Sequence, residues 1–381
     1  MPLNIGIDAS RNRSGGALAH LIGLIEEGTP ARFGIEKVHV WSYASLLDRL
    51  PNHQWLVIHR PPMIEKNILF QLFWQRFLFP KELRASGCDI LLNTDAGTVG
   101  KFRPCVTMSR DMLSYEPGEI ERYPIGKKRL RLWLLRFIQN RSLRFSDGVI
   151  FLTKYAAEVI QGISGKLNNT VIIPHGVHER FKAGSYSIPT QDALSRKINC
   201  LYVSNVAPYK HQWHVVHAIS KLRKQGYPIY LTLVGGGDKS SLLLLDRAIH
   251  STFESENFVN FHPFVENATL PLFLADADIF IFASSCENMP NTLIEAMAFG
   301  LPICSSKRGP MPEILRDGGL YFDPENPESI AASIRTIVDS LELRKVLSQR
   351  SKAYSEEFSW KRTSELTFSF LVETFMNRKP Q

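Results

Sequence analysis

Short apolar runs alternate along this chain with longer segments that have helical periodicity. The first run, residues 3–8, is followed by a turn and by a helical pattern over residues 17–26. Strands that alternate with helices form parallel sheets covered by helices on both faces. The N-terminal half therefore predicts an α/β domain. Its later strands are expected at residues 37–42, 55–59, 89–93, 105–109, 148–153 and 170–174.

A second series of the same kind begins after a polar stretch at residues 178–197. Its strands are expected at residues 200–204, 229–234, 259–261, 279–283 and 302–305. Two such series predict two Rossmann-like, doubly wound α/β domains that face a central cleft. We place the first domain at residues 1–180, the second at 181–360, and a C-terminal helix that returns to the first domain at 361–381.

The composition is that of a folded protein with an excess of basic residues. Apolar residues make up 44% and charged residues 22% of the 381 positions, which excludes a disordered chain. Lys and Arg number 45 against 37 Asp and Glu, and this net charge of +8 favours a phosphate ester, an acidic membrane surface or a nucleic acid as partner. The five cysteines form no Cys-x-x-Cys pair, so we expect a reducing, cytoplasmic location and no structural zinc.

The segment 286–302 carries the densest chemical signal. It follows an all-apolar strand, and its helix is expected to begin near Pro290 and to end at Gly300. Glu287 then lies in the strand-to-helix loop, and Glu295 about one turn into the helix. The first N–H groups of such a helix suit a diphosphate, and carboxylates suit sugar hydroxyls. Two ordinary exposed glutamates are the alternative, because this spacing alone is common.

Two other loops follow strands of the second domain. Lys210 lies just after the strand that ends at Val203, where its ammonium could reach the same phosphates. A solvated surface lysine is the alternative. Gly235 and Gly237 follow another strand and would let a ligand approach the backbone. They could equally form a plain turn, and they lack the Gly-x-Gly-x-x-Gly spacing of a nicotinamide site.

In this order along the chain, the motifs resemble those of one enzyme family. They are Asn205-x4-Lys210, Val234-Gly235-x-Gly237, Phe264-Val265, Ala277-Asp278, Glu287-x7-Glu295, Ala298-x-Gly300-Leu301-Pro302 and Phe358-Ser359-Trp360. The chain resembles the group 1 (family 4) retaining glycosyltransferases, which use nucleotide-sugars and have the two-domain GT-B fold. Residues 112–116 and 146–155 resemble the branch that builds bacterial surface polysaccharides such as O-antigen, often from mannose donors.

The resemblance implies a role for each matching residue. In similar enzymes the first glutamate of the pair contacts donor-sugar hydroxyls and the second holds the ribose, which assigns these roles to Glu287 and Glu295. Lys210 would grip the diphosphate. The other expected donor contacts are backbone groups of Asn291, Thr292 and Leu293 on phosphate, of Phe264 and Val265 at the nucleobase, and of the Gly15 and Gly16 loop that closes on the donor.

One departure from the family pattern concerns the phosphate site. The family usually has an arginine five residues before the lysine, and here that residue is Asn205. One phosphate-binding cation is therefore missing. Arg11, Arg13 or Arg110 would replace it.

Two other departures concern the sugar site. Residues 288–290 read Asn-Met-Pro where the family often has Gly-Phe-Gly, so a stiffer loop would alter sugar choice. Residues 108–111 stand where the family often carries a histidine. We take Arg110 and Asp111 as its substitutes, beside Glu287 and Lys210, in the catalytic set.

The implied reaction is hexose transfer with retention of the anomeric configuration, from a GDP- or UDP-linked donor to a hydroxyl of a glycan or lipid-linked acceptor. The leaving phosphate would help to deprotonate that hydroxyl. Such enzymes need no metal or cofactor, because cationic side chains and helix N–H groups stabilise the diphosphate. The alternative is a non-catalytic nucleotide-sugar-binding or scaffold subunit, which the missing arginine and histidine motivate.

Two segments of the N-terminal half raise the question of a membrane surface. Residues 67–80 hold five aromatic side chains, for which the core is the first interpretation and a lipid surface the second. Residues 122–144 form a basic amphipathic segment that suits a solvated face or docking to anionic lipids at the inner face of the plasma membrane. No nucleic-acid-binding module accompanies it, so no nucleic acid is expected as partner.

Overall fold

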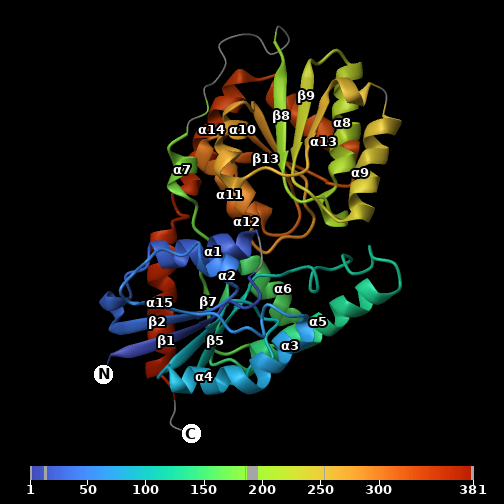
Figure 1. The fold of residues 1–381 in the computed structure, drawn as a ribbon. Coiled ribbons are helices and arrows are strands. Elements are labelled where there is room, and N and C mark those ends of the chain that lie inside the picture. The colour runs from blue at the N-terminus through green and yellow to red at the C-terminus, as the bar shows by residue number, and fades with distance from the viewer. Residues whose placement is uncertain (1, 13–14, 185, 187–195, 253, 379–381) are drawn as a thin grey trace. The chain divides into compact units, whose positions relative to one another are not determined.

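The computed structural model describes residues 2–12, 15–184, 186, 196–252 and 254–378. The chain forms two compact units, of which the first comprises Met1–Gly176 with Ser359–Gln381 and the second Val177–Phe358 (Figure 1). Each unit is a parallel sheet covered by helices, as the alternating pattern predicts. The unit boundaries lie at 176/177 and 358/359, whereas the sequence suggested 180/181 and 360/361.

The first unit contains a seven-stranded parallel sheet in the order β3-β2-β1-β4-β5-β6-β7. All seven predicted strands are present, each within two residues of its expected start. The strand order reverses between β1 and β4, and in doubly wound sheets ligands bind beyond the strands at such a switch point. The strands are β1 (Leu3–Asp8), β2 (Ile35–Trp41), β3 (Leu56–His59), β4 (Ile90–Asn93), β5 (Cys105–Ser109), β6 (Gly148–Phe151) and β7 (Thr170–Ile172).

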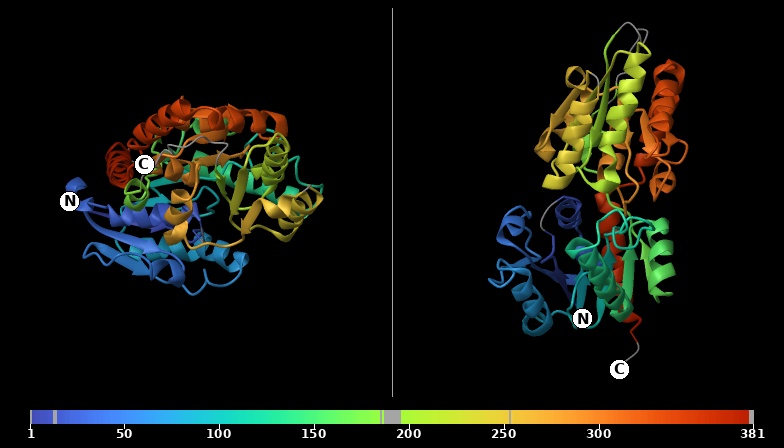
Figure 2. Two further views of the ribbon diagram at one scale, coloured as in Figure 1. Left: turned by 90° about the horizontal axis from the view of Figure 1, so that it is seen from above. Right: turned by 90° about the vertical axis from the view of Figure 1, so that its right-hand side faces the viewer.

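The last helix of the chain belongs to the first unit. In Figure 2 this red helix lies among the blue-to-green elements of that unit. It packs on the first helix, where Gly23 leaves room for Trp360: a Cβ at Gly23 would lie 2.3 Å from the indole. The helices of this unit are α1 (Gly16–Glu26), α2 (Ala44–Leu47), α3 (Ile68–Phe73), α4 (Phe79–Ala85), α5 (Lys127–Phe145), α6 (Lys154–Ser164) and α15 (Trp360–Met376).

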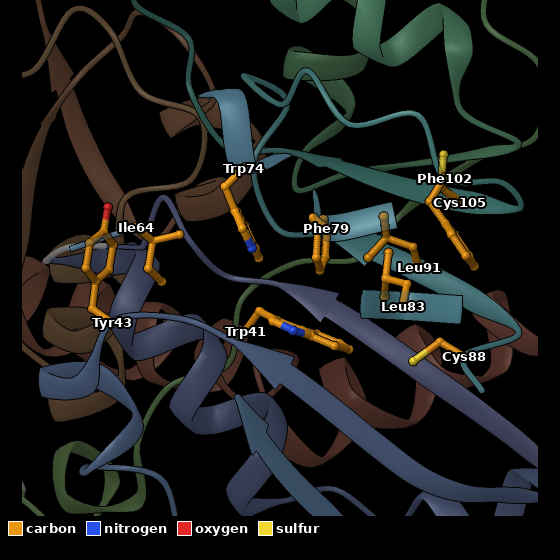
Figure 3. Packing of buried hydrophobic residues seen from close by; sticks show 10 residues of the cluster. All are labelled: Trp41, Tyr43, Ile64, Trp74, Phe79, Leu83, Cys88, Leu91, Phe102 and Cys105. Carbon is orange, nitrogen blue, oxygen red and sulfur yellow. The ribbon is translucent and has the colours of Figure 1, made fainter. Parts of the chain in front are cut away.

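An aromatic cluster forms part of the first unit's core (Figure 3). The Phe79 ring lies 5.2 Å from Trp41 and 4.5 Å from Trp74, between ring centroids. Both indole N–H groups donate to the carboxylate of Glu82, so the buried rings keep their polar atoms paired. The core interpretation of residues 67–80 is therefore confirmed for Trp74 and Phe79, which lie around a π-helical turn at Trp74–Leu78. The other three aromatic side chains of that segment, Phe70, Phe73 and Phe77, are exposed.

The second unit contains a six-stranded parallel sheet in the order β10-β9-β8-β11-β12-β13, which reverses between β8 and β11. The strand β13 was not predicted from the sequence, because its four residues, Gly-Leu-Tyr-Phe, are too few to show an alternating pattern. The strands are β8 (Ile198–Val203), β9 (Ile229–Val234), β10 (Val259–His262), β11 (Ile279–Phe282), β12 (Ile303–Ser306) and β13 (Gly319–Phe322). The helices are α7 (Glu179–Lys182), α8 (Gln212–Lys224), α9 (Lys239–Ser251), α10 (Leu270–Ala275), α11 (Asn291–Phe299), α12 (Met311–Leu315), α13 (Pro327–Val338) and α14 (Leu341–Ser355).

Candidate functional site

An ion pair lies at the switch point of the second sheet. Lys210 ends a short 3-10 turn after β8, Glu287 lies in the loop after β11, and Lys210 Nζ pairs with Glu287 Oε1. Only 8% of the Lys210 side chain and 14% of the Glu287 side chain are exposed. The alternatives of a solvated lysine and an ordinary exposed glutamate are therefore wrong at these two positions.

Hydrogen bonds fix the two loops against each other. Ser285 N donates to the Tyr209 carbonyl at 2.8 Å, and His211 Nε2 lies 2.9 Å from Ser285 Oγ. Tyr202 donates its hydroxyl to the Lys210 carbonyl at 2.7 Å. No role was predicted from the sequence for His211, Ser285 or Tyr202. A signal existed for Ser285, because two serines directly follow the apolar strand.

The surroundings of Lys210 explain how a charge is kept in a largely buried place. Its Nζ lies 5.4 Å from the Tyr209 ring centroid and 5.5 Å from that of Phe282, within range of a cation–π interaction. An ammonium has three N–H donors, so the bond to Glu287 leaves capacity for a second acceptor. A buried ion pair costs desolvation, and removing one partner leaves an uncompensated charge. Each member of this pair thus stabilises the other.

The glycines after β9 support the lysine loop. Gly235 has φ 128°, and a Cβ there would lie 2.2 Å from the Ser204 carbonyl oxygen. A Cβ at Gly237 would lie 2.4 Å from the Val206 carbonyl oxygen, and Val206 N donates to the Gly236 carbonyl at 2.7 Å. The close backbone approach at Gly235 is therefore to the protein's own loop after β8.

Helix α11 begins and ends where the sequence predicts. Pro290 is its N-cap and Gly300 its C-cap, the latter in the left-handed conformation at φ 84°. No side chain caps the N-terminus, so the backbone N–H groups of Asn291, Thr292 and Leu293 have no partner within the helix. Thr292 Oγ1 donates to the Val203 carbonyl at 3.0 Å, which ties this end of the helix to β8.

Glu295 lies in the second turn of α11, at a half-buried position. Burial raises the pKa of this carboxyl to about 7, and the positive charge of Arg180 on α7 opposes the rise. The Arg180 side chain also donates a hydrogen bond to Asn267 Oδ1. Glu295 is therefore close to half-protonated near neutral pH, unlike an ordinary exposed glutamate.

The remaining predicted residues of this unit lie at its surface. The Asn205 side chain is exposed, while its carbonyl accepts from Gln212 Nε2 at 3.0 Å. Phe264 follows β10 and is 80% exposed, and Val265 beside it is half-buried. An exposed ring at the end of a strand is free to stack on a planar ligand.

The first unit places Arg110 in a polar network at its own switch point. Arg110 Nη2 donates to Asn12 Oδ1 at 2.6 Å, and Thr94 Oγ1 donates to the same oxygen at 3.0 Å. Within the described residues, Nε and Nη1 of Arg110 are buried without a hydrogen-bond partner. Burial lowers the pKa of this guanidinium, and Asp95 opposes that shift. Two unpaired N–H groups on a buried cation suit an anion.

Of the other predicted residues of this unit, Arg11 and Asp111 have partners within the protein. Arg11 pairs with Asp95 at 3.2 Å. Arg13 lies outside the described residues. Asp111 accepts from Leu113 N at 3.0 Å and from Gln139 Nε2 at 3.4 Å, and burial raises its pKa.

The first helix and a buried histidine pair complete this edge of the first sheet. Gly15, with φ 62°, precedes α1, which starts at Gly16 and has no capping side chain. His20 and His175 lie with their Nδ1 atoms 2.7 Å apart, and burial lowers the pKa of His175 to about 3. Both rings also contact Trp360. This pair was not predicted from the sequence, because its members are 155 residues apart.

Among the described residues, no group of three or more His, Cys, Asp or Glu side chains could hold a metal ion. No helix in that part of the chain is long and apolar enough to cross a membrane.

The second unit is similar to a known protein family. Residues 189–354 match the family model of glycosyl transferases group 1, which lies within the unit Val177–Phe358. The second unit is a group 1 glycosyltransferase domain. Over 173 residues, the chain is 26% identical to the O-antigen chain mannosyltransferase B of Escherichia coli. The match covers 44% of each chain, so it spans less than half of that relative's length.

Solved structures extend the likeness in fold to both units of the chain. Sucrose-phosphate synthase of Thermosynechococcus elongatus aligns with a TM-score of 0.74 and 16% identity, over 96% of this chain and 97% of that one. Anabaena Alr3699/HepE, solved with UDP and glucose, aligns with a TM-score of 0.72 and 20% identity, over 96% of this chain and 98% of that one. The chain therefore has the α/β GT-B fold with two Rossmann-like domains, as the resemblance implied.

Proposed function

We propose that this protein is a retaining glycosyltransferase that moves a hexose from a nucleotide diphosphate-sugar to a hydroxyl of a glycan or lipid-linked acceptor in polysaccharide biosynthesis. The observation that carries the proposal is the Lys210–Glu287 pair beside the uncapped start of α11. Mannose is our first choice of sugar, because an O-antigen mannosyltransferase is among the relatives. The proposed donor carries either GDP or UDP as its nucleotide.

The chemistry of the second unit supports a division of roles. Lys210 would donate to the diphosphate while it keeps its bond to Glu287, and the N–H groups of α11 would bind phosphate oxygens. Glu287 would accept from donor-sugar hydroxyls, and Glu295 from the ribose. The Lys210 ammonium and the N–H groups of α11 would stabilise the leaving diphosphate without a metal ion. Arg110 and Asp111 are the groups that we propose as catalytic in the first unit.

The experiment begins with the donor. GDP, UDP, GDP-mannose and UDP-glucose are each added to the full chain and its melting temperature is followed, because a ligand that binds the native state raises it. The stabilising conjugate is then supplied with a radiolabelled sugar and a lipid extract. Labelled glycolipid or glycan is expected, and the anomeric product is identified by NMR. A product of inverted configuration would contradict the retaining mechanism.

A second candidate function rests on Asn205, whose exposed side chain stands where the family usually has an arginine. A non-catalytic subunit would bind the donor and release no sugar. Slow hydrolysis of the donor without acceptor therefore separates the two: free hexose supports the transferase, and its absence despite binding supports the scaffold. Transfer that continues in the presence of a chelator would support metal independence.

A further inference from the structure

Exposed apolar side chains are concentrated on two helical segments of the first unit. The described residues include 18 large apolar side chains that are exposed, and ten of these lie within residues 68–77 and 125–137. We call these ten side chains the apolar patch. Leu78 and Phe145, which follow the two segments, pack against the same aromatic core cluster. Both segments therefore lead into the same part of the first unit's core.

The α5 part of the patch has the spacing of an amphipathic helix. Leu130, Trp133, Leu134 and Phe137 are exposed at intervals of three and four residues, so they share one face. The first buried residue of α5 is Gln139, after twelve helical residues. Helices of this length gain most of their stability by burying an apolar face. The exposed face is thus suited to a partner that covers it.

Positive charge surrounds that face. Helix α5 carries seven Lys and Arg and no Asp or Glu. Arg136 stacks over the Trp133 ring, with its guanidinium carbon 3.8 Å from the centroid. Arg131 and Arg141 are exposed and take part in no ion pair among the described residues. An apolar face bordered by arginines is typical of helices that lie in a membrane interface.

The part of the patch at residues 68–77 shows the same combination of exposed apolar side chains and basic neighbours. Leu69 is 71% exposed and Phe77 53%. The Phe73 and Phe77 ring centroids lie 5.1 Å apart, and Arg76 lies over the Phe77 ring. Lys66 lies over the Phe70 ring, 4.9 Å from its centroid. Basic side chains thus accompany the exposed rings in both segments.

We propose that the apolar patch docks on an anionic lipid surface, with its rings among the acyl chains and headgroups and its arginines on lipid phosphates. Charge complementarity selects this occupant, because a second copy of the same surface would bring seven positive charges of one α5 against seven of another. The proposal does not rest on the transferase activity. It is tested without any sugar donor.

Flotation with vesicles tests the lipid and its charge. The full chain is mixed with vesicles of phosphatidylcholine alone or of phosphatidylcholine with phosphatidylglycerol. Binding is expected only with phosphatidylglycerol and is expected to weaken as salt is raised, because the attraction is screened. No binding to the anionic vesicles, or equal binding to both kinds, would overturn the proposal.

A patch variant and a control variant, each with two substitutions, test whether the exposed rings of the patch bind the vesicles. Trp133→Ser with Phe137→Ser is expected to weaken binding tenfold or more, because each ring removes apolar area from water. The control is Leu243→Ser with Leu244→Ser, at exposed positions of α9 in the second unit. All four positions are exposed, so circular dichroism melts are expected to match the parent. A control that loses as much binding as the patch variant would overturn the assignment.

A second double variant tests how much the positive charges contribute to vesicle binding, apart from the burial of the rings. Arg131→Gln with Arg141→Gln is expected to cost about fivefold per residue, which is the ~1 kcal/mol of one basic side chain near an anionic surface. Lys224→Gln with Lys345→Gln, both exposed in the second unit, is the control and should bind as the parent does. Gel filtration gives the remaining outcome: self-association that Trp133→Ser abolishes, with vesicle binding intact, would assign the patch to a second copy and overturn the proposal.

Discussion

The two glutamates of the second sheet's edge have different surroundings. Glu287 shares a largely buried place with the Lys210 ammonium, and the two charges compensate each other. Glu295 has only the Coulombic influence of Arg180 against its burial, and its pKa rises to about 7. Substitution of Glu287 therefore tests the charge pairing, and substitution of Glu295 tests the protonation of a buried carboxyl.

The first prediction concerns the ion pair. Glu287→Gln is expected to lower kcat/KM for transfer about a hundredfold, because it removes a charged hydrogen bond of about 3 kcal/mol to the donor sugar. Initial rates with the identified donor measure it. The matched control is Glu328→Gln, which breaks an exposed Lys–Glu pair with Lys221 in the same unit. Unchanged transfer in Glu287→Gln would remove Glu287 from the site.

The second prediction concerns pH. An ionised carboxylate accepts from ribose hydroxyls more strongly than a neutral acid, so donor affinity is expected to rise as pH increases through the Glu295 pKa of about 7. Calorimetric titration of the nucleoside diphosphate over this range measures the rise. Glu295→Gln should bind weakly at every pH, without this rise. A parent whose affinity does not change with pH would contradict the assignment.

The same raised pKa has a consequence for stability, with a definite sign. The folded protein holds a proton on Glu295 between its ordinary pKa of 4.5 and about 7, whereas the unfolded chain has released it. This group's contribution to the free energy of unfolding therefore falls as pH rises across that window. The loss is complete above the folded pKa, and Glu295→Gln should remove it.

At the scale of elements, the loop after β9 acts as a support for the loop after β8. The bridge between Val206 and Gly237 extends the β8–β9 pairing beyond both strands. Gly235 can be close to the Ser204 carbonyl because it has no Cβ. Lys210 thus depends on residues that are remote from it in sequence.

The third prediction follows from this support. Gly235→Ala is expected to displace the β8 loop and to weaken binding of the donor nucleotide about tenfold, through a Cβ 2.2 Å from backbone at φ 128°. Thermal-shift titration measures the affinity. The control is Gly226→Ala, which also has a positive φ, 91°, but has open space around its Cβ. Equal donor affinity in the two variants would contradict a supporting role.

At the scale of the whole molecule, the chain crosses from the first unit to the second and back. The return places α15 in the first unit, where Phe368 and Leu371 are fully buried. The Phe368 ring centroid lies 6.4 Å from that of Phe33, close to the other end of the sequence. The core of the first unit is thus completed only when the C-terminal helix is present.

The fourth prediction tests this completion. Phe368→Ala is expected to lower the free energy of unfolding of the first unit by about 3–5 kcal/mol, the usual cost of truncating a buried phenylalanine. Denaturant titration followed by circular dichroism measures it. Leu366→Ala, at an exposed position of the same helix, should cost under ~1 kcal/mol. Similar losses in the two variants would contradict the packing described for α15.

Local features of this protein could be predicted from its amino-acid sequence. Twelve strands, the bounds of α11 and the loop positions of Lys210 and Glu287 follow from apolar periodicity and from the proline and glycine at the helix ends, which act over a few residues. The missed strand, β13, is short and has little periodicity.

Which of these residues are buried, and which of them contact one another, became known from the three-dimensional fold. The switch point of the second sheet brings Lys210 to Glu287 across 77 residues, and packing within the first unit brings His20 to His175 across 155. The fold also decided that one face of residues 67–80 packs in the core while Phe73 and Phe77 stay exposed. The physical reason is that burial and strand order depend on contacts between distant segments, which no local pattern encodes.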